Sequence, residues 1–412
     1  MPRRPRVAQR GTLFRPREPA FWLYAVILVV TGIVAIGQQS VFRRISPAGW
    51  ALSWGLLLLY ALPVFLVVYF LDLYEREPPS LLLGALLWGA VAATTLSALA
   101  NVGWGLVVAR IGGPEFAARW TAALTAPLVE ETFKGLGVVM IYLIARSELD
   151  DVMDGFVYGA LCGLGFAVVE DVFYFVGVFG GTTQEVLRGF FLRVVASGLY
   201  SHVLYTGLVG MGIGYYVSRR EVTPREKRLK VAAGLAGLAV LGHFLWNSPF
   251  LDLFPSPPWT GADWLLIPLA AAVKGLPLLG FVVAAVMLAR RREERWLRTA
   301  LADEVGAIGI SPDELAALAE PRRRRAARRE MKARAGDRAA SLLARLQREQ
   351  VNLAMVRSRV AMGDDPAVIA QRDYCRSLRD ALQAMPGAAP AESAEFGASA
   401  RPPMPPPQPG EG

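Results

Sequence analysis

The chain has 412 residues, of which 54% are hydrophobic and 19% are charged, and its mean hydropathy is +0.36. Soluble globular domains carry about 25% charged residues, so this composition excludes a water-soluble enzyme, a disordered protein and a disulfide scaffold. The net charge of +9 is typical of nucleic-acid-binding proteins, but the basic residues flank apolar segments, so we expect no nucleic-acid partner. The two cysteines, Cys162 and Cys375, lie far apart and offer no paired-cysteine site.

Apolar blocks long enough to cross a bilayer alternate with short charged stretches along the chain. This pattern predicts an all-α fold, a polytopic membrane helix bundle of about eight transmembrane helices. The fifth expected span contains Gly155, Gly159 and Gly163, a spacing typical of a face on which a second helix packs closely. The expected spans are roughly 21–37, 50–72, 81–110, 120–145, 152–180, 195–217, 231–254 and 264–289.

Basic residues fall on one side of the membrane if the spans number eight. They gather before the first span, in the loop at 218–230 and directly after the last span. The positive-inside rule therefore predicts a multi-pass protein of the plasma membrane with both termini cytoplasmic. The same basic segments are expected to contact anionic lipid.

The composition divides the chain into four parts. We expect a basic cytoplasmic N-terminus at 1–20, a transmembrane domain at 21–289, a helical, partly disordered cytoplasmic tail from 290 whose helical part ends at 385, and a disordered Pro/Ala/Gly-rich end at 386–412. In the tail, the run Ser311-Pro312-Asp313-Glu314 predicts a helix start, because it supplies a hydroxyl cap, a proline in the first helical position and a carboxylate in the third.

The most informative residues are ionisable side chains inside the expected spans, where each costs about 2.5–3.5 kcal/mol on insertion scales. The chain has two histidines in all, and both are among these residues. Counted from the outer ends of the spans, the glutamates and histidines lie at similar depth, which predicts one polar layer open to the outer side. The residues are Glu130, Glu131 and Lys134 in the fourth span, Glu170 and Asp171 in the fifth, His202 in the sixth, His243 in the seventh and Lys274 in the eighth.

Local spacing indicates which of these side chains interact. Lys134 follows Glu131 by three residues and Glu130 by four, so it can pair with either carboxylate. His243 and Asn247 share one helix face, so the amide can orient the ring or a bound water. Lys134 and Asn247 are therefore expected to be supporting residues. A simpler alternative is that the Glu–Glu–Lys group is an ion pair that only fixes helix packing.

The eighth span adds Lys274, for which a structural and a functional role are equally open. Asp171 in the fifth span is a candidate ion-pair partner for it.

Glutamates, histidines and an asparagine at one depth suit hydrolysis of a peptide bond. A buried carboxylate can act as a base toward water and then as an acid toward the leaving amine, and Glu130 and Glu131 are the candidates. Two histidines and one carboxylate are also the ligand set of many catalytic zinc sites. In that version Glu170, His202 and His243 bind Zn²⁺, and Glu130 or Glu131 is the base.

Several motifs resemble those of the PrsW family of intramembrane metalloproteases, which is similar to the CAAX-protease and bacteriocin-processing group. They are Glu130-Glu131-Thr132-Phe133-Lys134, Phe166-Ala167-Val168-Val169-Glu170, His202, and His243 with Asn247. The likeness covers roughly residues 50–290, and Asp171 departs from the asparagine expected in the family. The resemblance implies an intramembrane protease domain at 21–289 that hydrolyses a membrane-anchored protein, with anti-sigma factors and other signalling proteins as candidate substrates.

Two other classes of function stay open. A membrane transporter or proton relay can use the same buried polar residues, although the sequence lacks the inverted repeat typical of transporters and the polar groups form one layer. A non-catalytic scaffold could recruit partners through the tail, but it would not need buried glutamates and histidines together.

Overall fold

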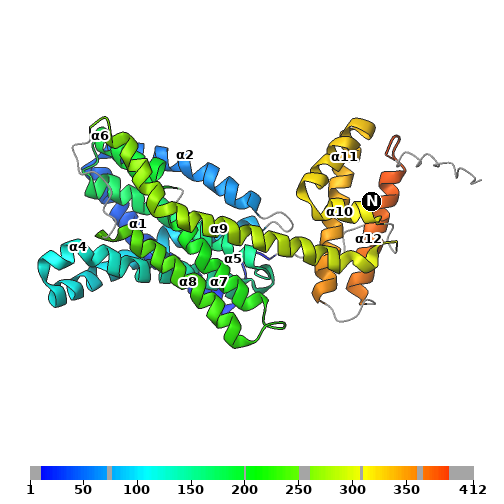
Figure 1. Cartoon of the computed structure of the whole chain (residues 1–412), viewed down its shortest axis with the longest axis horizontal. Helices are drawn as coiled ribbons and strands as arrows, with labels where there is room; N and C mark the ends of the chain where they lie inside the picture. Colours follow the sequence, from blue (N-terminus) through cyan, green and yellow to red (C-terminus); the bar gives the residue numbers. More distant parts are fainter. Residues whose placement is uncertain are drawn as a thin grey trace, which may run out of the picture. The chain divides into compact units, whose positions relative to one another are not determined.

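The computed structural model of the chain describes residues 11–71, 77–198, 201–249, 260–306, 310–359 and 365–388 (Figure 1). The expectations for 1–10 and 389–412 lie outside these residues. Within them the structure consists of helices and connecting turns, with a single isolated β-bridge between Val305 and Ile310. The all-α prediction is therefore confirmed. The chain forms two compact units, divided between Arg292 and Glu293.

The first unit contains the long apolar helices. In chain order its elements are α1 (Pro19–Ile45), α2 (Pro47–Leu71), α3 (Pro79–Leu87), the π-helix η2 (Trp88–Ala93), α4 (Thr94–Ile144), η3 (Arg146–Glu148), α5 (Val152–Val172), the π-helix η4 (Phe173–Val178), α6 (Thr183–Phe190), the π-helix η5 (Phe191–Ala196), α7 (His202–Ser218), α8 (Arg225–Asn247) and the greater part of α9 (Asp263–Leu301).

The second unit is built from η8 (Ala302–Glu304), α10 (Pro312–Ala319), α11 (Pro321–Arg359) and α12 (Pro366–Gln383). Ser311 Oγ accepts a hydrogen bond from the Glu314 backbone N–H, and Pro312 opens α10, so the predicted helix start is confirmed. Inside this unit the buried Glu304 carboxylate is paired with the guanidinium groups of Arg357 and Arg372.

Six helical segments among the described residues are long and apolar enough to cross a membrane. They are Pro19–Ile45, Pro47–Leu71, Pro79–Ile144, Val152–Val178, Arg225–Asn247 and Asp263–Glu304. The chain is thus a multi-pass membrane protein, but the expected count of eight spans is not confirmed. Two differences explain this: the expected third and fourth spans form one helical run, and α7 has only 17 residues.

The expected third and fourth spans are joined by a sharp break and not by an open loop. Helical structure is present on both sides of Gly113 and is interrupted at this residue. Its φ of +83° is a conformation that glycine adopts with little steric cost. The two arms then run antiparallel, since Asn101 Nδ2 donates to Glu130 Oε1 at 3.2 Å and a Cβ on Gly105 would touch Thr121. One glycine therefore folds the long run into a hairpin of two arms.

The expected start of the sixth span at 195 is wrong. Thr182 and Glu185 form a capping box, which begins the short helix α6 where a loop was expected. The helix continues as η5 to Ala196, and the next helix, α7, begins at His202. His202 therefore lies at the first position of its helix, where the sequence placed it well inside a span.

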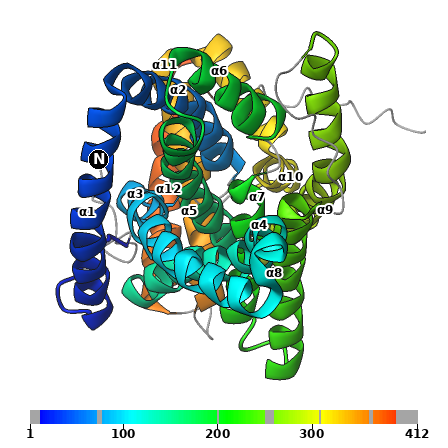
Figure 2. The ribbon, with the colours of Figure 1, turned by 90° about the vertical axis from the view of Figure 1, so that its left-hand side faces the viewer.

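Helix α5 is the centre of the first unit and packs against α2, α3, α4 and α7 (Figure 2). All of its residues are buried except Val152 and Glu170. A Cβ on Gly155, Gly159 or Gly163 would overlap the α7 backbone at Gly210, Thr206 or His202 respectively. The glycine face predicted from sequence is therefore confirmed, and it sets how closely the two helices approach.

Replacing Gly159 by alanine should destabilise the bundle, because the added methyl would overlap the Thr206 backbone oxygen. Overpacking of a tight contact costs about 1–3 kcal/mol. Gly55→Ala on α2 is the matched control, since nothing lies within 4 Å of a Cβ there. Thermal unfolding in detergent measures both, and equal melting temperatures for the two variants would contradict the close packing of α5 on α7.

Candidate active site

The second arm of α4 carries the first group of buried charges. Glu130, Glu131 and Lys134 are 4%, 2% and 0% exposed. The Lys134 ammonium lies 2.6 Å from Glu131 Oε1 and 3.7 Å from Glu130 Oε2, so it contacts both carboxylates as their spacing predicts. Its charge also lies over the Phe166 ring, 4.3 Å from the centroid. The lysine is thus enclosed by two carboxylates and an aromatic face.

Glu131 is the fully bonded carboxylate of the pair. Its Oε1 lies 2.6 Å from Lys134 Nζ and 3.1 Å from His243 Nδ1. Its Oε2 accepts a hydrogen bond from Thr206 Oγ1 on α7 at 2.9 Å. Both oxygens are therefore engaged, and Glu131 ties α4 to α7 and α8.

Glu130 differs because one of its oxygens accepts no hydrogen bond among the described residues. Oε1 accepts from Asn101 Nδ2, whereas Oε2 is buried without a hydrogen-bond partner among the described residues. This oxygen lies 3.9 Å from His202 Nδ1 and 3.9 Å from His243 Nε2. A buried oxygen without a hydrogen bond is costly and needs an explanation, and here it faces two imidazole nitrogens.

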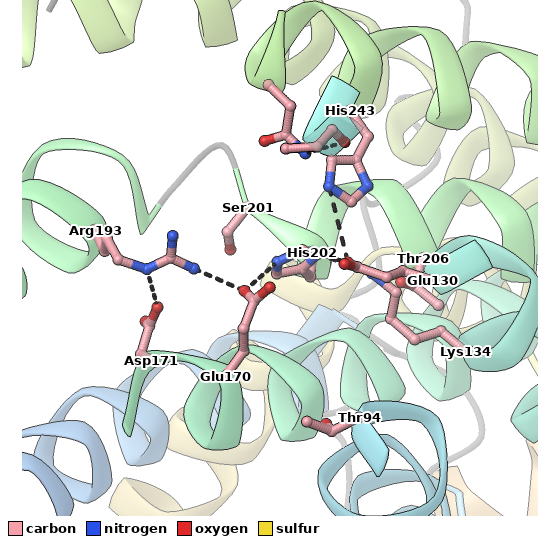
Figure 3. Close-up of polar contacts among 12 residues, drawn as sticks. Thr94, Glu130, Lys134, Glu170, Asp171, Arg193, Ser201, His202, Thr206 and His243 are labelled. Atoms are coloured by element: carbon pink, nitrogen blue, oxygen red, sulfur yellow. Dashed lines mark hydrogen bonds and ion pairs between the residues drawn. The ribbon is translucent and has the colours of Figure 1, made fainter. Parts of the chain in front are cut away.

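The two rings can be assigned from their partners. An ammonium group only donates, so His202 Nδ1, which lies 2.8 Å from Lys134 Nζ, accepts. The proton of a neutral ring is then on Nε2, which donates to Glu170 Oε2 at 3.0 Å (Figure 3). By the same reasoning His243 Nδ1 donates to the Glu131 carboxylate, which leaves the Nε2 lone pair facing Glu130. The His243 ring is stacked on Tyr205 at 4.9 Å.

Glu170 and Asp171 on α5 are joined by a residue from η5. Arg193 Nη2 donates to Glu170 Oε2 at 2.7 Å, and Arg193 Nε donates to Asp171 Oδ1. The guanidinium also lies 3.8 Å from the centre of the Tyr174 ring. In Figure 3 this group continues from Asp171 through Arg193 and Glu170 to His202. A second cluster of charges therefore borders the first.

The structure brings together Glu130, Glu131, Lys134, Glu170, His202 and His243, but two sequence-based contacts are wrong. Asn247 Nδ2 donates to the Ala122 backbone oxygen at 3.4 Å, so its predicted contact with the His243 ring is wrong, while its other predicted role, orienting a bound water, stays a prediction. Asp171 pairs with Arg193, while Lys274 Nζ donates to the Trp246 backbone oxygen. Asn247 lies on the predicted helix face, but its amide donates to a backbone oxygen of α4.

Three residues of the site were missed from sequence. Arg193 lies just before the expected sixth span, in the apolar run Phe190-Phe191-Leu192-Arg193-Val194-Val195. Thr206 follows His202 by four residues, so it shares a face with that ring. Asn101 is an amide inside the third expected span. The apolar residues on both sides of Arg193 and the i, i+4 spacing of Thr206 from His202 are the sequence features that could have identified them.

One group among the described residues could hold a metal ion, formed by Glu130, His202 and His243. One ligand atom from each lies within 4.8 Å of the others, and all three residues are buried. Two imidazoles and one carboxylate are a common catalytic zinc set. The sequence had assigned the carboxylate position to Glu170, whereas the geometry groups Glu130 with the two histidines.

Buried carboxylates and imidazoles that meet between apolar helices fit the class of membrane-embedded hydrolytic enzymes. Residues 77–273 match the model of a family described as "PrsW family intramembrane metalloprotease". This part of the chain, just under half of its length, is similar to the PrsW family. All the clustered residues, from Glu130 to His243, lie inside the matched region.

Curated relatives give the same result. The chain is 26% identical over 162 residues to Protease PrsW of Bacillus subtilis (strain 168), and 27% identical over 199 residues to that of Geobacillus kaustophilus (strain HTA426). It is 27% identical over 167 residues to Protease PrsW of Clostridioides difficile (strain 630). The alignments cover 39%, 48% and 40% of this chain and 66%, 72% and 65% of the relatives, so the chain spans about two thirds of their length. No solved structure matches the chain.

Replacing Thr206 by valine should destabilise the protein, because it removes the hydroxyl that donates to Glu131 Oε2 and leaves that oxygen without this donor. Loss of a buried partner costs about 1–3 kcal/mol. The control is Thr132→Val, since the exposed Thr132 hydroxyl donates to the Leu128 carbonyl of its own helix and to no other group that the structure describes. Chemical unfolding in detergent measures the difference, and a Thr206→Val variant as stable as Thr132→Val would refute the role of this bond.

Proposed function

We propose that the chain is an intramembrane peptidase, which hydrolyses a peptide bond of a membrane-anchored protein at the Glu130–His202–His243 group. The observation that supports this most is Oε2 of Glu130, which has no hydrogen bond among the described residues and faces the lone-pair nitrogens of two imidazoles in a buried site. A transporter does not need such a convergent donor set, and the relatives are named as proteases.

The donor set fits a divalent metal, and we propose Zn²⁺. Glu130 Oε2, His202 Nδ1 and His243 Nε2 would hold it. The other nitrogen of each ring is bonded to a carboxylate, Glu170 for His202 and Glu131 for His243. Such carboxylate–histidine pairs fix the tautomer and orientation of metal-binding imidazoles. When bound, Zn²⁺ supplies Lewis-acid polarisation of the scissile carbonyl and activation of water near neutral pH.

Charge balance supports the same assignment. Four carboxylates, Glu130, Glu131, Glu170 and Asp171, meet two cations, Lys134 and Arg193. With neutral histidines the formal charge of these side chains is therefore −2, which one divalent cation would balance. Uncompensated charge in a bundle interior is unfavourable by several kcal/mol, so a cation is expected to bind tightly.

Lys134 adds a condition to this proposal. Its ammonium contacts His202 Nδ1, the nitrogen assigned to the metal. Two cations cannot share that lone pair, so Lys134 would keep its shorter contact with Glu131 Oε1 and release His202. The lysine would then compensate the charge of Glu131 and hold this carboxylate between α4 and α8.

We assign the proton transfer to Glu170. It is one of two residues of α5 that are not buried, and its side chain is 16% exposed. Its Oε2 accepts hydrogen bonds from both Arg193 and His202. Oε1 is therefore the oxygen that can exchange a proton with water and with the leaving amine. Glu131, with both oxygens bonded, is poorly suited to that task. A general base of this kind contributes about 10²–10⁴-fold to the rate.

The setting in the cell follows from the sequence. We propose a plasma-membrane protein whose termini are cytoplasmic, with the basic segments before the first span, at 218–230 and directly after the last span against anionic lipid headgroups. The candidate substrates are membrane-anchored signalling proteins such as anti-sigma factors.

Glu130→Gln and Glu170→Gln should each lower cleavage of a membrane-anchored peptide library by about 10²–10⁴-fold, because the first removes a carboxylate ligand and the second a proton acceptor. The protein is reconstituted in liposomes, and products are identified by mass spectrometry. Glu226→Gln is the control, since that carboxylate is 78% exposed and, within the described part of the chain, pairs with Lys230 alone. Cleavage by Glu130→Gln at the wild-type rate would reject the site, and ion flux without any cleavage would favour a transporter.

Metal content gives an independent prediction. Wild-type protein should retain one Zn²⁺ per chain, and His243→Ala should lose it because one of three protein ligands is gone. Elemental analysis of the purified proteins measures this, with Glu226→Gln again as the control. Full cleavage by a zinc-free protein would show instead that the glutamates work without a metal.

A further inference from the structure

Arg193 is a charged residue held inside the bundle by one turn of a neighbouring helix. Its Nε donates to Asp171 and its Nη2 donates to Glu170, and the guanidinium lies over the ring of Tyr174. The three partners lie within five residues of each other on α5 and η4. Figure 3 shows the guanidinium between the two carboxylates. A fork of two donors and a flat stacking face are features of arginine that lysine lacks.

This arrangement reaches the proposed active site through a single oxygen. Glu170 Oε2 accepts hydrogen bonds from both Arg193 Nη2, at 2.7 Å, and His202 Nε2, at 3.0 Å. Arg193 therefore fixes the carboxylate that fixes the ring. The opposite nitrogen of that ring, Nδ1, is the one that faces Glu130.

The fold does not need this ion pair to hold η5 in place. Phe191 packs edge-to-face on Trp264 of α9, with centroids 4.8 Å apart. Ala196 is buried with Ile267 and Ala271 of the same helix. These apolar contacts attach η5 to α9, so the anchoring of η5 does not depend on Arg193 alone.

We propose that Arg193 is a positioning residue of this site: it sets the orientation of His202 through Glu170, and Asp171 holds the guanidinium in place for that task. The orientation of His202 by Arg193 is inferred from the contacts alone. The consequence for catalysis rests on the proposed peptidase function.

The two histidines of the chain make this orientation directly measurable. In ¹⁵N-histidine-labelled protein each ring gives its own nitrogen signals, assigned with a His243→Gln variant. Arg193→Gln should shift the His202 ring signals, because the Glu170 carboxylate that accepts from Nε2–H is no longer held by Arg193, and it should leave those of His243 in place. Arg188→Gln, which removes a charge from the adjacent helix α6, is the matched control and should shift neither ring.

The outcomes decide the proposal. Unchanged nitrogen signals of both rings in Arg193→Gln would overturn it, because Arg193 would then not be coupled to His202. Equal changes in the signals of both rings would also overturn it, because they would indicate a general loss of structure. If Arg193→Gln does not fold, Arg193→Lys and Asp171→Asn take its place. Both should shift His202 by a smaller amount, since one donor of the fork or its carboxylate partner is lost, and unchanged His202 signals in both would also overturn it.

Kinetics separates this proposal from the proposed function. In cleaving protein, Arg193→Gln should lower kcat by about 10–100-fold with little change in KM, which is the usual effect of losing a partner that orients an active-site group. Arg193→Lys should recover part of the loss. If wild type cleaves nothing, the peptidase function fails while the ring signals still decide the positioning role. If Arg193→Gln cleaves at the wild-type rate, the positioning role fails and the peptidase function stands.

Discussion

The compensation of charge in a low-dielectric interior is the constraint on which this structure depends. Glutamates enclosed by apolar helices are stable only where cations and donors reach them, and those partners come from helices far apart in sequence. Lys134 comes from the same helix as Glu131, whereas Thr206 and His243 come from α7 and α8. The network therefore links the helices as much as it builds a site.

Close helix packing makes these distances attainable. The glycine face of α5 lets the backbone of α7 approach until His202 lies beside Gly163. Glu170 is seven residues further along α5, on the part of the helix that is not fully buried. A side chain larger than hydrogen at those glycines would separate the helices and with them the carboxylate and the ring. Packing and chemistry are thus set by the same short stretch of sequence.

Three π-helical segments, η2, η4 and η5, border the site, and two of them carry its residues or follow them directly. Tyr174 belongs to η4 and Arg193 to η5. A π-turn changes the direction of the side chains that follow it, and such turns are frequent at functional sites. Ordinary helical spacing would not bring Arg193 to the same carboxylates, which is why the periodicity of the sequence gave no sign of this contact.

The sequence by itself determined the class of fold, the helix that starts at Ser311, the glycine face and six of the clustered residues. Each depends on local composition or on spacing along one helix, and both can be read from a single chain. Tertiary structure alone decided the hairpin at Gly113, the start of α7 at His202, the partner of Asp171, and the grouping of Glu130 with the histidines. These depend on distances between helices, which are set by packing and by competition for donors, and no periodicity along one segment records them.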